Sequence, residues 1–348
     1  SLCRRLPGGV PLTDSVRRDI AAHNADMAAQ ALRVLGVAYK NLEMLPREMS
    51  AAALEQDLTF AGLVGMMDPP RPEVKGAVAQ CHAAGIRPVM ITGDHKLTAV
   101  AVARELNIFR PGDLAITGAD LDFMPQEMLE QEVEKFAVYA RVSPEHKMRI
   151  VKAWQARGKV VAMTGDGVND APALKAADIG CAMGVAGTDV AKGASDMILT
   201  DDNFATIVSA VEQGRGIYAN IKKAIHYLLS CNIGEMLTIF LATALDFRQM
   251  PLVPVQLLWL NLVTDSLPAL ALGVEPVEKN VMEHRPRDAG EKLFAGGFAW
   301  RLCWQGCMVG LLTLCAFFLG QYIIPGPSAP SAAANTMAFA TLTICQLF

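Results

Sequence analysis

Hydrophobic residues are distributed differently in the two parts of the chain. Before residue 215 they form short runs between polar segments. From residue 224 onward they form long runs at 224–245, 251–274 and 298–324, and another that begins near 335. A helix needs about 20 mostly apolar residues to cross a bilayer. The pattern predicts a stalk and membrane helices at about 204–247, 251–274, 298–324 and 335–348, the last one incomplete.

Basic residues beside these runs predict their orientation. Lys222 and Lys223 precede the first run, whereas the links on the other side offer only Arg248. The link at 275–297 carries four basic residues: Lys279, Arg285, Arg287 and Lys292. Lysine and arginine gather on the cytoplasmic side of membrane proteins. We therefore expect a multi-pass integral membrane protein in the lipid bilayer, with the soluble region and the 275–297 link in the cytoplasm.

Short apolar runs alternate with helix-like segments between about Leu63 and Thr200. Candidate strands include FAGLVGMMD, IRPVMIT, VYARV and KVVAMT. This alternation predicts an α/β fold, with a parallel sheet covered by helices on both faces. Ligands of such sheets bind beyond the carboxyl ends of the strands. The residues that follow these runs are therefore the candidate site.

A phosphate-binding segment is predicted where IRPVMIT ends. Thr92, Gly93 and Asp94 follow this strand, and a hydroxyl with backbone N–H groups at a helix start can hold a phosphate. Lys147, in ARVSPEHK, could neutralise the bound anion. By itself Thr-Gly-Asp more often caps a helix, and a single lysine near a helix start is more often solvated. Neither feature is specific alone.

An acid-rich turn follows the strand KVVAMT. It runs from Asp166 through Asn169 to Asp170. Mg²⁺ prefers one or two carboxylates together with phosphate oxygens and water, so Asp166 is a candidate ligand. Asn169 could donate to a phosphate oxygen, and Asp170 could fix the loop or assist the metal shell. A calcium-binding EF-hand loop is the alternative, but the required acid spacing and later glutamate are missing.

Polar residues inside the membrane runs are candidates for an ion site, because they are costly in a bilayer. Asn232 and Glu235 share a helix face, as do Asn261, Thr264 and Asp265. Their oxygens form a hard set that suits Ca²⁺. Soft metals would want thiolates, and the sequence contains no Cys-Pro-Cys. Hydrogen bonding between helices is the alternative for Asn and Thr, but it leaves the two carboxylates unexplained.

Composition adds little to this picture. The chain has 348 residues, of which 52% are hydrophobic, and a net charge of -4. Basic residues form no strong patch, so nucleic acid is not an expected partner. The eight cysteines are scattered and contain no CxxC pair, which predicts neither a disulfide framework nor a structural metal site.

The soluble motifs resemble a known family. MITGDHKLTA, ARVSPEHK and MTGDGVNDAPALKAADIG are similar to the phosphorylation domain of P-type ion-pumping ATPases, in the haloacid-dehalogenase superfamily. The resemblance implies an α/β haloacid-dehalogenase-like (Rossmann-like) domain that uses ATP and Mg²⁺. It implies phosphoryl contacts from Thr92 and Gly93, a nucleotide contact from Asp94, and phosphate or cofactor binding by Arg141 and Lys147. It also implies Mg²⁺ binding at Asp166, with support from Asn169 and Asp170.

The membrane motifs carry the resemblance further. SCNIGEMLTIF and VQLLWLNLVTDSLPALALGVEP are similar to calcium pumps of the sarcoplasmic-reticulum type and their bacterial relatives. This implies that Ca²⁺ is transported and that Asn232, Glu235, Asn261, Thr264 and Asp265 bind it, in a bacterial plasma membrane. The same family would carry Glu where Gln346 stands, so Gln346 is an expected ligand without the charge.

The resemblance also sets the expected domains. Residues 1–67 would be the end of a nucleotide-binding domain, 68–203 the phosphorylation domain, and 204–348 the stalk and membrane helices. The family's nucleophile motif Asp-Lys-Thr-Gly-Thr and its actuator motif Thr-Gly-Glu-Ser are absent from the sequence. We therefore expect a fragment of an ATP-driven pump that is inactive alone. The alternatives are a membrane-anchored phosphatase of the same superfamily and a truncated, non-catalytic cation-binding membrane protein.

Overall fold

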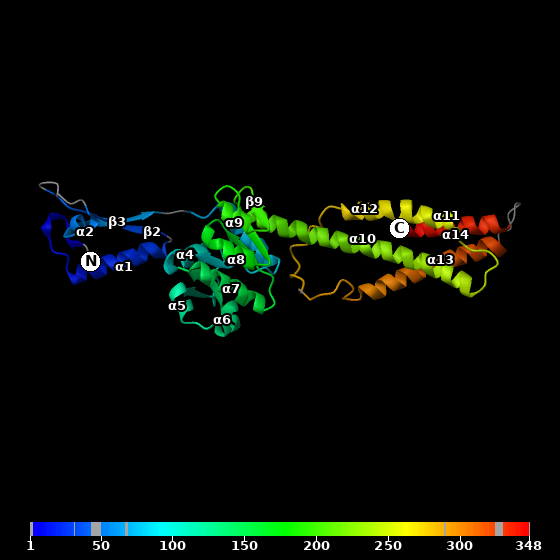
Figure 1. Cartoon of the computed structure of the whole chain (residues 1–348), viewed down its shortest axis with the longest axis horizontal. Coiled ribbons are helices and arrows are strands. Elements are labelled where there is room, and N and C mark those ends of the chain that lie inside the picture. Colours follow the sequence, from blue (N-terminus) through cyan, green and yellow to red (C-terminus); the bar gives the residue numbers. More distant parts are fainter. Residues whose placement is uncertain are drawn as a thin grey trace. The chain divides into compact units, whose positions relative to one another are not determined.

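The computed structural model describes residues 3–30, 32–42, 50–66, 69–288, 290–323 and 330–347. The chain divides into two compact units, Ser1–Val208 and Ser209–Phe348. Figure 1 shows the elements in chain order, and each unit is described by itself.

The first unit begins with a small sheet and one long helix. Strand β3 pairs in parallel with β1 and antiparallel with β2, in the order β1-β3-β2. The prediction that FAGLVGMMD belongs to the parallel sheet is therefore wrong, because the backbone groups of β3 are already paired within this sheet. The elements are β1 (Cys3–Arg5), η1 (Pro7–Gly9), α1 (Asp14–Ala29), β2 (Arg33–Tyr39), α2 (Ala51–Leu54) and β3 (Leu58–Met66).

Six parallel strands form the rest of the first unit, in two sheets rather than one. The orders are β4-β6-β5 and β7-β8-β9. The strands are β4 (Met90–Thr92), β5 (Leu114–Thr117), β6 (Phe136–Ala140), β7 (Ala162–Gly165), β8 (Ile179–Met183) and β9 (Met197–Leu199). The helices are α3 (Pro72–Ala83), α4 (Lys96–Glu105), α5 (Gly118–Asp122), α6 (Gln126–Glu132), η2 (Val133–Lys135), α7 (Pro144–Ala156), η3 (Val168–Asp170), α8 (Ala171–Ala176) and α9 (Asp189–Gly193).

The expected parallel pairing is confirmed, but the expected single sheet is not. Within the described residues, β4 and β7 are edge strands that do not pair with each other. Side chains join the two sheets instead: Ile91 of β4 and Val161, which precedes β7, pack against the core clusters of both. The pattern of apolar residues predicts that a strand is buried. It does not predict which other strand will form hydrogen bonds with it.

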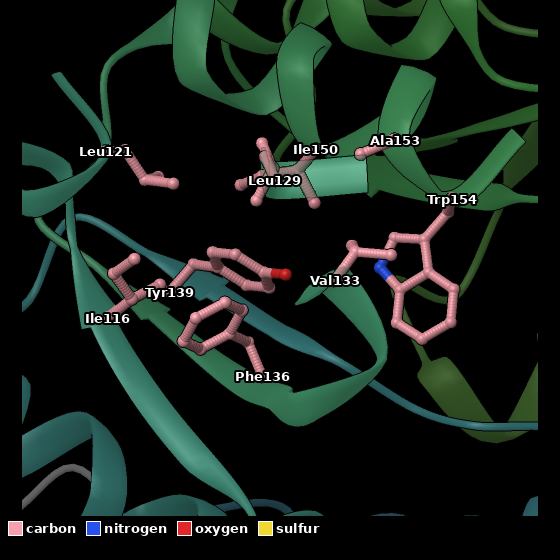
Figure 2. Packing of buried hydrophobic residues seen from close by; sticks show 9 residues of the cluster. All are labelled: Ile116, Leu121, Leu129, Val133, Phe136, Tyr139, Ile150, Ala153 and Trp154. Carbon is pink, nitrogen blue, oxygen red and sulfur yellow. The ribbon is translucent and has the colours of Figure 1, made fainter. Parts of the chain in front are cut away.

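Helix α7 connects the two cores. On one side Ile150, Ala153 and Trp154 pack with Tyr139 and other buried residues of the first sheet (Figure 2). On another side Val151 packs against the second core, which contains Met163 and Leu174. Because both cores hold α7, the first turn of this helix has a defined position beside the carboxyl ends of the strands.

The second unit is helical, and three of its segments are long and apolar enough to cross a membrane, as predicted. They are α10 (Phe204–Ala244), the segment Pro254–Gly273 and α13 (Phe298–Tyr322). The second segment consists of α11 (Pro254–Trp259), a π-helix η4 (Leu260–Thr264) and α12 (Ser266–Gly273). The fourth helix, α14 (Pro330–Leu347), begins before the predicted position near 335. It lies beside α13 (Figure 1).

Small residues allow α10 and α13 to approach closely. A Cβ atom added to Gly306 would lie 2.4 Å from Ile233 Cγ2, and one added to Gly310 would lie 3.0 Å from the Gly234 carbonyl oxygen. Thr238, which is fully buried, donates a hydrogen bond to the Gly234 carbonyl oxygen of its own helix. Close contact between backbones at small residues is typical of packed membrane helices.

The link after α12 is tied to α10 by polar contacts. Arg215 donates to the carbonyl oxygens of Val281 and His284 at 2.9 and 2.8 Å. Asn220 donates to the Glu275 carbonyl oxygen at 2.6 Å. These bonds satisfy carbonyl groups of an irregular segment, so they hold this link against the helix that carries Glu235.

Candidate functional site

Two groups of the predicted residues come together, one in each unit. In the first unit, β4 ends at Thr92 and α4 begins four residues later, at Lys96. The Thr92 hydroxyl donates to Asp94 Oδ2 at 3.2 Å, and the Asp94 N–H donates to Thr92 Oγ1 at 3.1 Å. The helix cap is His95, whose Nδ1 accepts from the Leu97 N–H. The helix-cap alternative for Thr-Gly-Asp is therefore wrong.

Arg141 follows β6 at the same end of the first sheet. The Val142 N–H bonds to the Thr92 carbonyl oxygen at 3.5 Å, so the two strand ends are neighbours. Arg141 adopts a left-handed backbone conformation with φ of 52°, and its side chain is exposed. Gly118 packs against the backbone of Arg141, and a Cβ atom added to Gly118 would lie 2.3 Å from the Arg141 carbonyl oxygen. Because the Arg141 side chain is exposed, it can reach a ligand beyond the carboxyl ends of β4 and β6.

Lys147 lies in the first turn of α7 and forms an ion pair with Asp170. Its ammonium donates to Asp170 Oδ1. The helix start is fixed by a reciprocal cap between Ser143 and His146. Both side chains of the ion pair are shielded from solvent, with 17% of Lys147 and 8% of Asp170 exposed. The pair joins α7 to the turn after β7.

Asp170 also holds the acidic turn together. Its Oδ2 atom accepts from the N–H groups of Asp166 and Gly167 at 3.2 and 3.1 Å. Burial opposes ionisation, but the Lys147 ammonium and these two N–H groups outweigh it and lower the pKa of Asp170. Gly165 leaves room for this carboxylate, since an added Cβ would lie 2.4 Å from Asp170 Cβ.

The turn leaves Asp166 and Asn169 exposed. The Asp166 carbonyl oxygen accepts from the Thr188 N–H at 2.8 Å, which fixes its backbone while the carboxylate stays in solvent. A hard cation such as Mg²⁺ fits the exposed Asp166 carboxylate, because Mg²⁺ is usually bound by one or two carboxylates together with phosphate oxygens and water. The Asp170 carboxylate already accepts hydrogen bonds from Lys147 and from two backbone N–H groups. It is therefore better placed to hold the acidic turn in position than to bind a metal ion directly.

In the second unit, the Glu235 carboxylate receives two side-chain amides. Asn261 donates to Oε2 at 3.3 Å and Gln346 donates to Oε1 at 3.1 Å. Glu235 is 4% exposed and Gln346 is 6% exposed. Three elements, α10, η4 and α14, therefore meet at one buried carboxylate.

Asp265 is the second buried carboxylate, with 2% of its surface exposed. Among the residues that the structure describes, neither of its carboxylate oxygens has a hydrogen-bond partner. Asp265 and the 6% exposed Thr264 lie at the end of the π-helix, where the Asp265 N–H bonds back to the Leu260 carbonyl oxygen. π-helical turns frequently occur at functional sites, because they change the pattern of backbone bonding.

Asn232 is placed less favourably. Its side-chain NH₂ group donates to the Leu228 carbonyl oxygen of its own helix at 2.7 Å. This leaves the Oδ1 atom as the potential ligand. Within the described part of the chain, no three side chains of the His, Cys, Asp and Glu types gather as a metal cluster. Any cation between these helices would depend on neutral oxygens as well as on Glu235 and Asp265.

Known proteins match both parts of the chain. A haloacid dehalogenase-like hydrolase model matches residues 10–178, and a second model of that description matches 148–211. A model described as the C-terminus of cation transporting ATPases matches residues 249–348. Calcium-transporting ATPase 1 of Bacillus cereus is 50% identical over 97% of this chain. The chain belongs to the P-type cation-transporting ATPases.

Other relatives of this ATPase family give the same result. The calcium-transporting ATPase of Bacillus subtilis is 50% identical over 92% of the chain, and calcium-transporting ATPase 1 of Lactococcus lactis is 46% identical over 96%. The chain spans 39%, 36% and 37% of the lengths of the Bacillus cereus, Bacillus subtilis and Lactococcus lactis proteins.

Two residues beside the predicted cation ligands were not singled out by the sequence analysis. Tyr227 donates through its hydroxyl to the Thr264 carbonyl oxygen at 2.7 Å. Cys231 is 4% exposed and lies beside the Asp265 carboxylate. Cys231 lies four residues and Tyr227 eight residues before Glu235 along α10, and this helical spacing is the signal that could have revealed them.

Proposed function

We propose that this chain contains the phosphorylation domain and the C-terminal membrane helices of a longer pump, which uses ATP to move Ca²⁺ across a bacterial plasma membrane. Residues 1–67 would close a nucleotide-binding domain, 68–203 would form the phosphorylation domain, and 204–348 the stalk and membrane part. Asp68, at the start of the second range, lies outside the described residues. The soluble unit would be cytoplasmic.

The observation that carries this proposal is the Asp265 carboxylate. It is buried in the membrane unit with neither oxygen bonded within the described part of the chain. An uncompensated buried charge costs several kcal/mol, so a carboxylate in this position requires a bound cation or a proton. Thr264 directly precedes Asp265 in the chain, and Glu235, to which Asn261 and Gln346 donate, supplies further oxygens from the same unit. Carboxylate and amide oxygens are the ligands that Ca²⁺ prefers.

The first unit supports the ATP-dependent step. We assign Thr92, Gly93 and Lys147 to the transferred phosphoryl group, and Asp94 and Arg141 to the nucleotide. Asp166 would hold Mg²⁺, which supplies charge neutralisation in phosphoryl transfer. Asn169 would donate to a phosphate oxygen. Asp170 would position both Lys147 and the acidic turn, since it binds each of them.

The nucleophile is proposed to come from another part of the longer protein. These 348 residues contain no Asp-Lys-Thr-Gly-Thr motif. The phosphorylated group would be the aspartate of that motif. This polypeptide alone should form no phosphoenzyme, whereas the longer protein should form an aspartyl phosphate that hydroxylamine cleaves.

ATP-dependent uptake of radioactive Ca²⁺ into inverted membrane vesicles tests the proposal. Vesicles with the full-length protein should accumulate Ca²⁺, and Asp265→Asn should abolish uptake while leaving the protein in the membrane. Asp246→Asn is a matched control, because Asp246 is exposed and its left-handed backbone, with φ of 50°, is tolerated by Asn. Ca²⁺ uptake that persists in Asp265→Asn would contradict the assignment of Ca²⁺. ATP-dependent uptake of a different cation in place of Ca²⁺ would also contradict it.

A further inference from the structure

Cys231 lies on the face of α10 that meets the π-helix. Tyr227, one turn before it, bonds to the Thr264 carbonyl oxygen at 2.7 Å. Glu235, one turn after it, accepts from Asn261 at 3.3 Å. Residues four apart stand above one another on a helix, so the Cys231 side chain lies between these two contacts. Its 4% exposure is consistent with that enclosed position.

The Cys231 thiol faces a carboxylate with unused oxygens. The thiol lies one turn from Tyr227, whose hydroxyl bonds to the Thr264 carbonyl oxygen, so the thiol faces the end of the π-helix where Asp265 stands. Only 2% of the Asp265 surface is exposed, and neither carboxylate oxygen has a hydrogen-bond partner in the described residues. A soft sulfur ligand and a free carboxylate are thus enclosed together between α10 and η4.

We propose that Cys231 and Asp265 form a binding site for a thiophilic divalent cation of the Cd²⁺ or Zn²⁺ class, which shares Asp265 with the transported cation. This inference rests on the proposed cation site, and it assigns to that site a second class of ligand. Ca²⁺ takes oxygen ligands and gains little from sulfur. Cd²⁺ and Zn²⁺ bind thiolates strongly.

The charges balance for such a cation. Metal binding replaces the thiol proton, which leaves to the solvent, and the thiolate and the carboxylate together carry two negative charges. Glu235 is engaged by Asn261 and Gln346, so it is not required. The Tyr227 hydroxyl oxygen and water complete the coordination. A thiophilic cation held here by Asp265 excludes Ca²⁺ and competes with it.

Cadmium binding to the purified full-length protein tests the site. Cd²⁺ should produce a thiolate-to-metal charge-transfer absorption in the ultraviolet, and excess Ca²⁺ should reduce it. Cys231→Ser should remove this absorption and lower Cd²⁺ affinity at least about tenfold, since the loss of even a supporting group costs 10–100-fold. Binding of radioactive Ca²⁺ should be retained. The control Cys307→Ser, at a half-buried cysteine of α13, should keep the absorption.

The possible outcomes separate this inference from the proposed function. Equal absorption and Cd²⁺ affinity in the wild type and in Cys231→Ser would overturn the cadmium site, while retained Ca²⁺ binding would leave the calcium proposal intact. If the wild type binds no Ca²⁺ but shows absorption that both Cys231→Ser and Asp265→Asn remove, the calcium proposal fails and the thiophilic site stands. Cys231→Ala, with the same readout, replaces the serine variant if that variant does not fold.

Discussion

Gln346 donates a 3.1 Å hydrogen bond to Glu235, so an amide occupies the position where a second carboxylate would face the first. Both side chains are buried. The Gln346 Oε1 atom has no hydrogen-bond partner in the described residues, which leaves it available to a cation. The proposed cation site therefore has two carboxylates, from Glu235 and Asp265, rather than three.

Gln346→Glu should make folding more dependent on Ca²⁺. The new carboxylate would face Glu235 at close range and without solvent, and like charges so placed repel. We expect a lower thermal midpoint without Ca²⁺ and a larger rise on adding Ca²⁺ than in the wild type, because the cation neutralises both groups. Thermal melting of the detergent-solubilised protein at several Ca²⁺ concentrations measures this.

Thr336→Asp is the control for that variant, because it adds a carboxylate to an exposed position of the same helix. It should leave the size of the Ca²⁺-dependent rise unchanged. If Gln346→Glu behaves like this control, the Glu235 and Gln346 side chains do not share a cation site.

Asp170→Asn should destabilise the α/β unit. It removes the ionic partner of Lys147, of which only 17% is exposed, and weakens the bonds to the N–H groups of the acidic turn. The expected loss in free energy of unfolding is about 3 kcal/mol, at the lower end of the range for breaking buried pairs because Lys147 keeps some solvent contact. Urea-dependent proteolysis of the full chain reports the loss. Asp166→Asn is the matched control and should have little effect, since Asp166 is exposed.

Acid should destabilise the same unit through Asp170. Its pKa is lower in the folded state than the unfolded value of about 3.9. A depressed pKa contributes stability that is fully present above the unfolded pKa and is lost as the pH falls through the folded pKa. The free energy of unfolding should thus decline below about pH 4. Asp170→Asn should show a shallower decline over this window; a decline as steep as in the wild type would assign it to other carboxyl groups.

Gly306→Ala should destabilise the packing of α10 against α13. The added Cβ would lie 2.4 Å from Ile233 Cγ2, and the β-branched isoleucine has little rotamer freedom in a helix. Overpacking of this kind costs about 1–3 kcal/mol. Thermal melting in detergent should show a lower midpoint.

Gly214→Ala controls for helix propensity in that experiment. Gly214 also lies inside a helix, but nothing is found within 4 Å of an added Cβ. The alanine should stabilise α10 by about 0.5–1 kcal/mol. Equal effects of the two substitutions would mean that the helices separate or shift without cost.

The sequence by itself determined much of this protein. The apolar runs were long enough to predict three spanning helices, because the thickness of a bilayer sets a minimum length. The i, i+3 and i+4 spacings grouped Asn261, Thr264 and Asp265 on one face, because the helix repeat is fixed by backbone geometry. The motifs that contain Thr92, Lys147 and Asp170 indicated the family, which the known relatives confirm.

Only the tertiary structure decided which side chains meet. Asp170 bonds to Lys147 and to the N–H groups of its own turn. Gln346 of α14 bonds to Glu235 of α10. The tertiary structure also divided the predicted sheet in two and placed Cys231 beside Asp265. Such contacts join residues far apart in the chain. They depend on the relative positions of whole elements, and local periodicity carries no information about those positions.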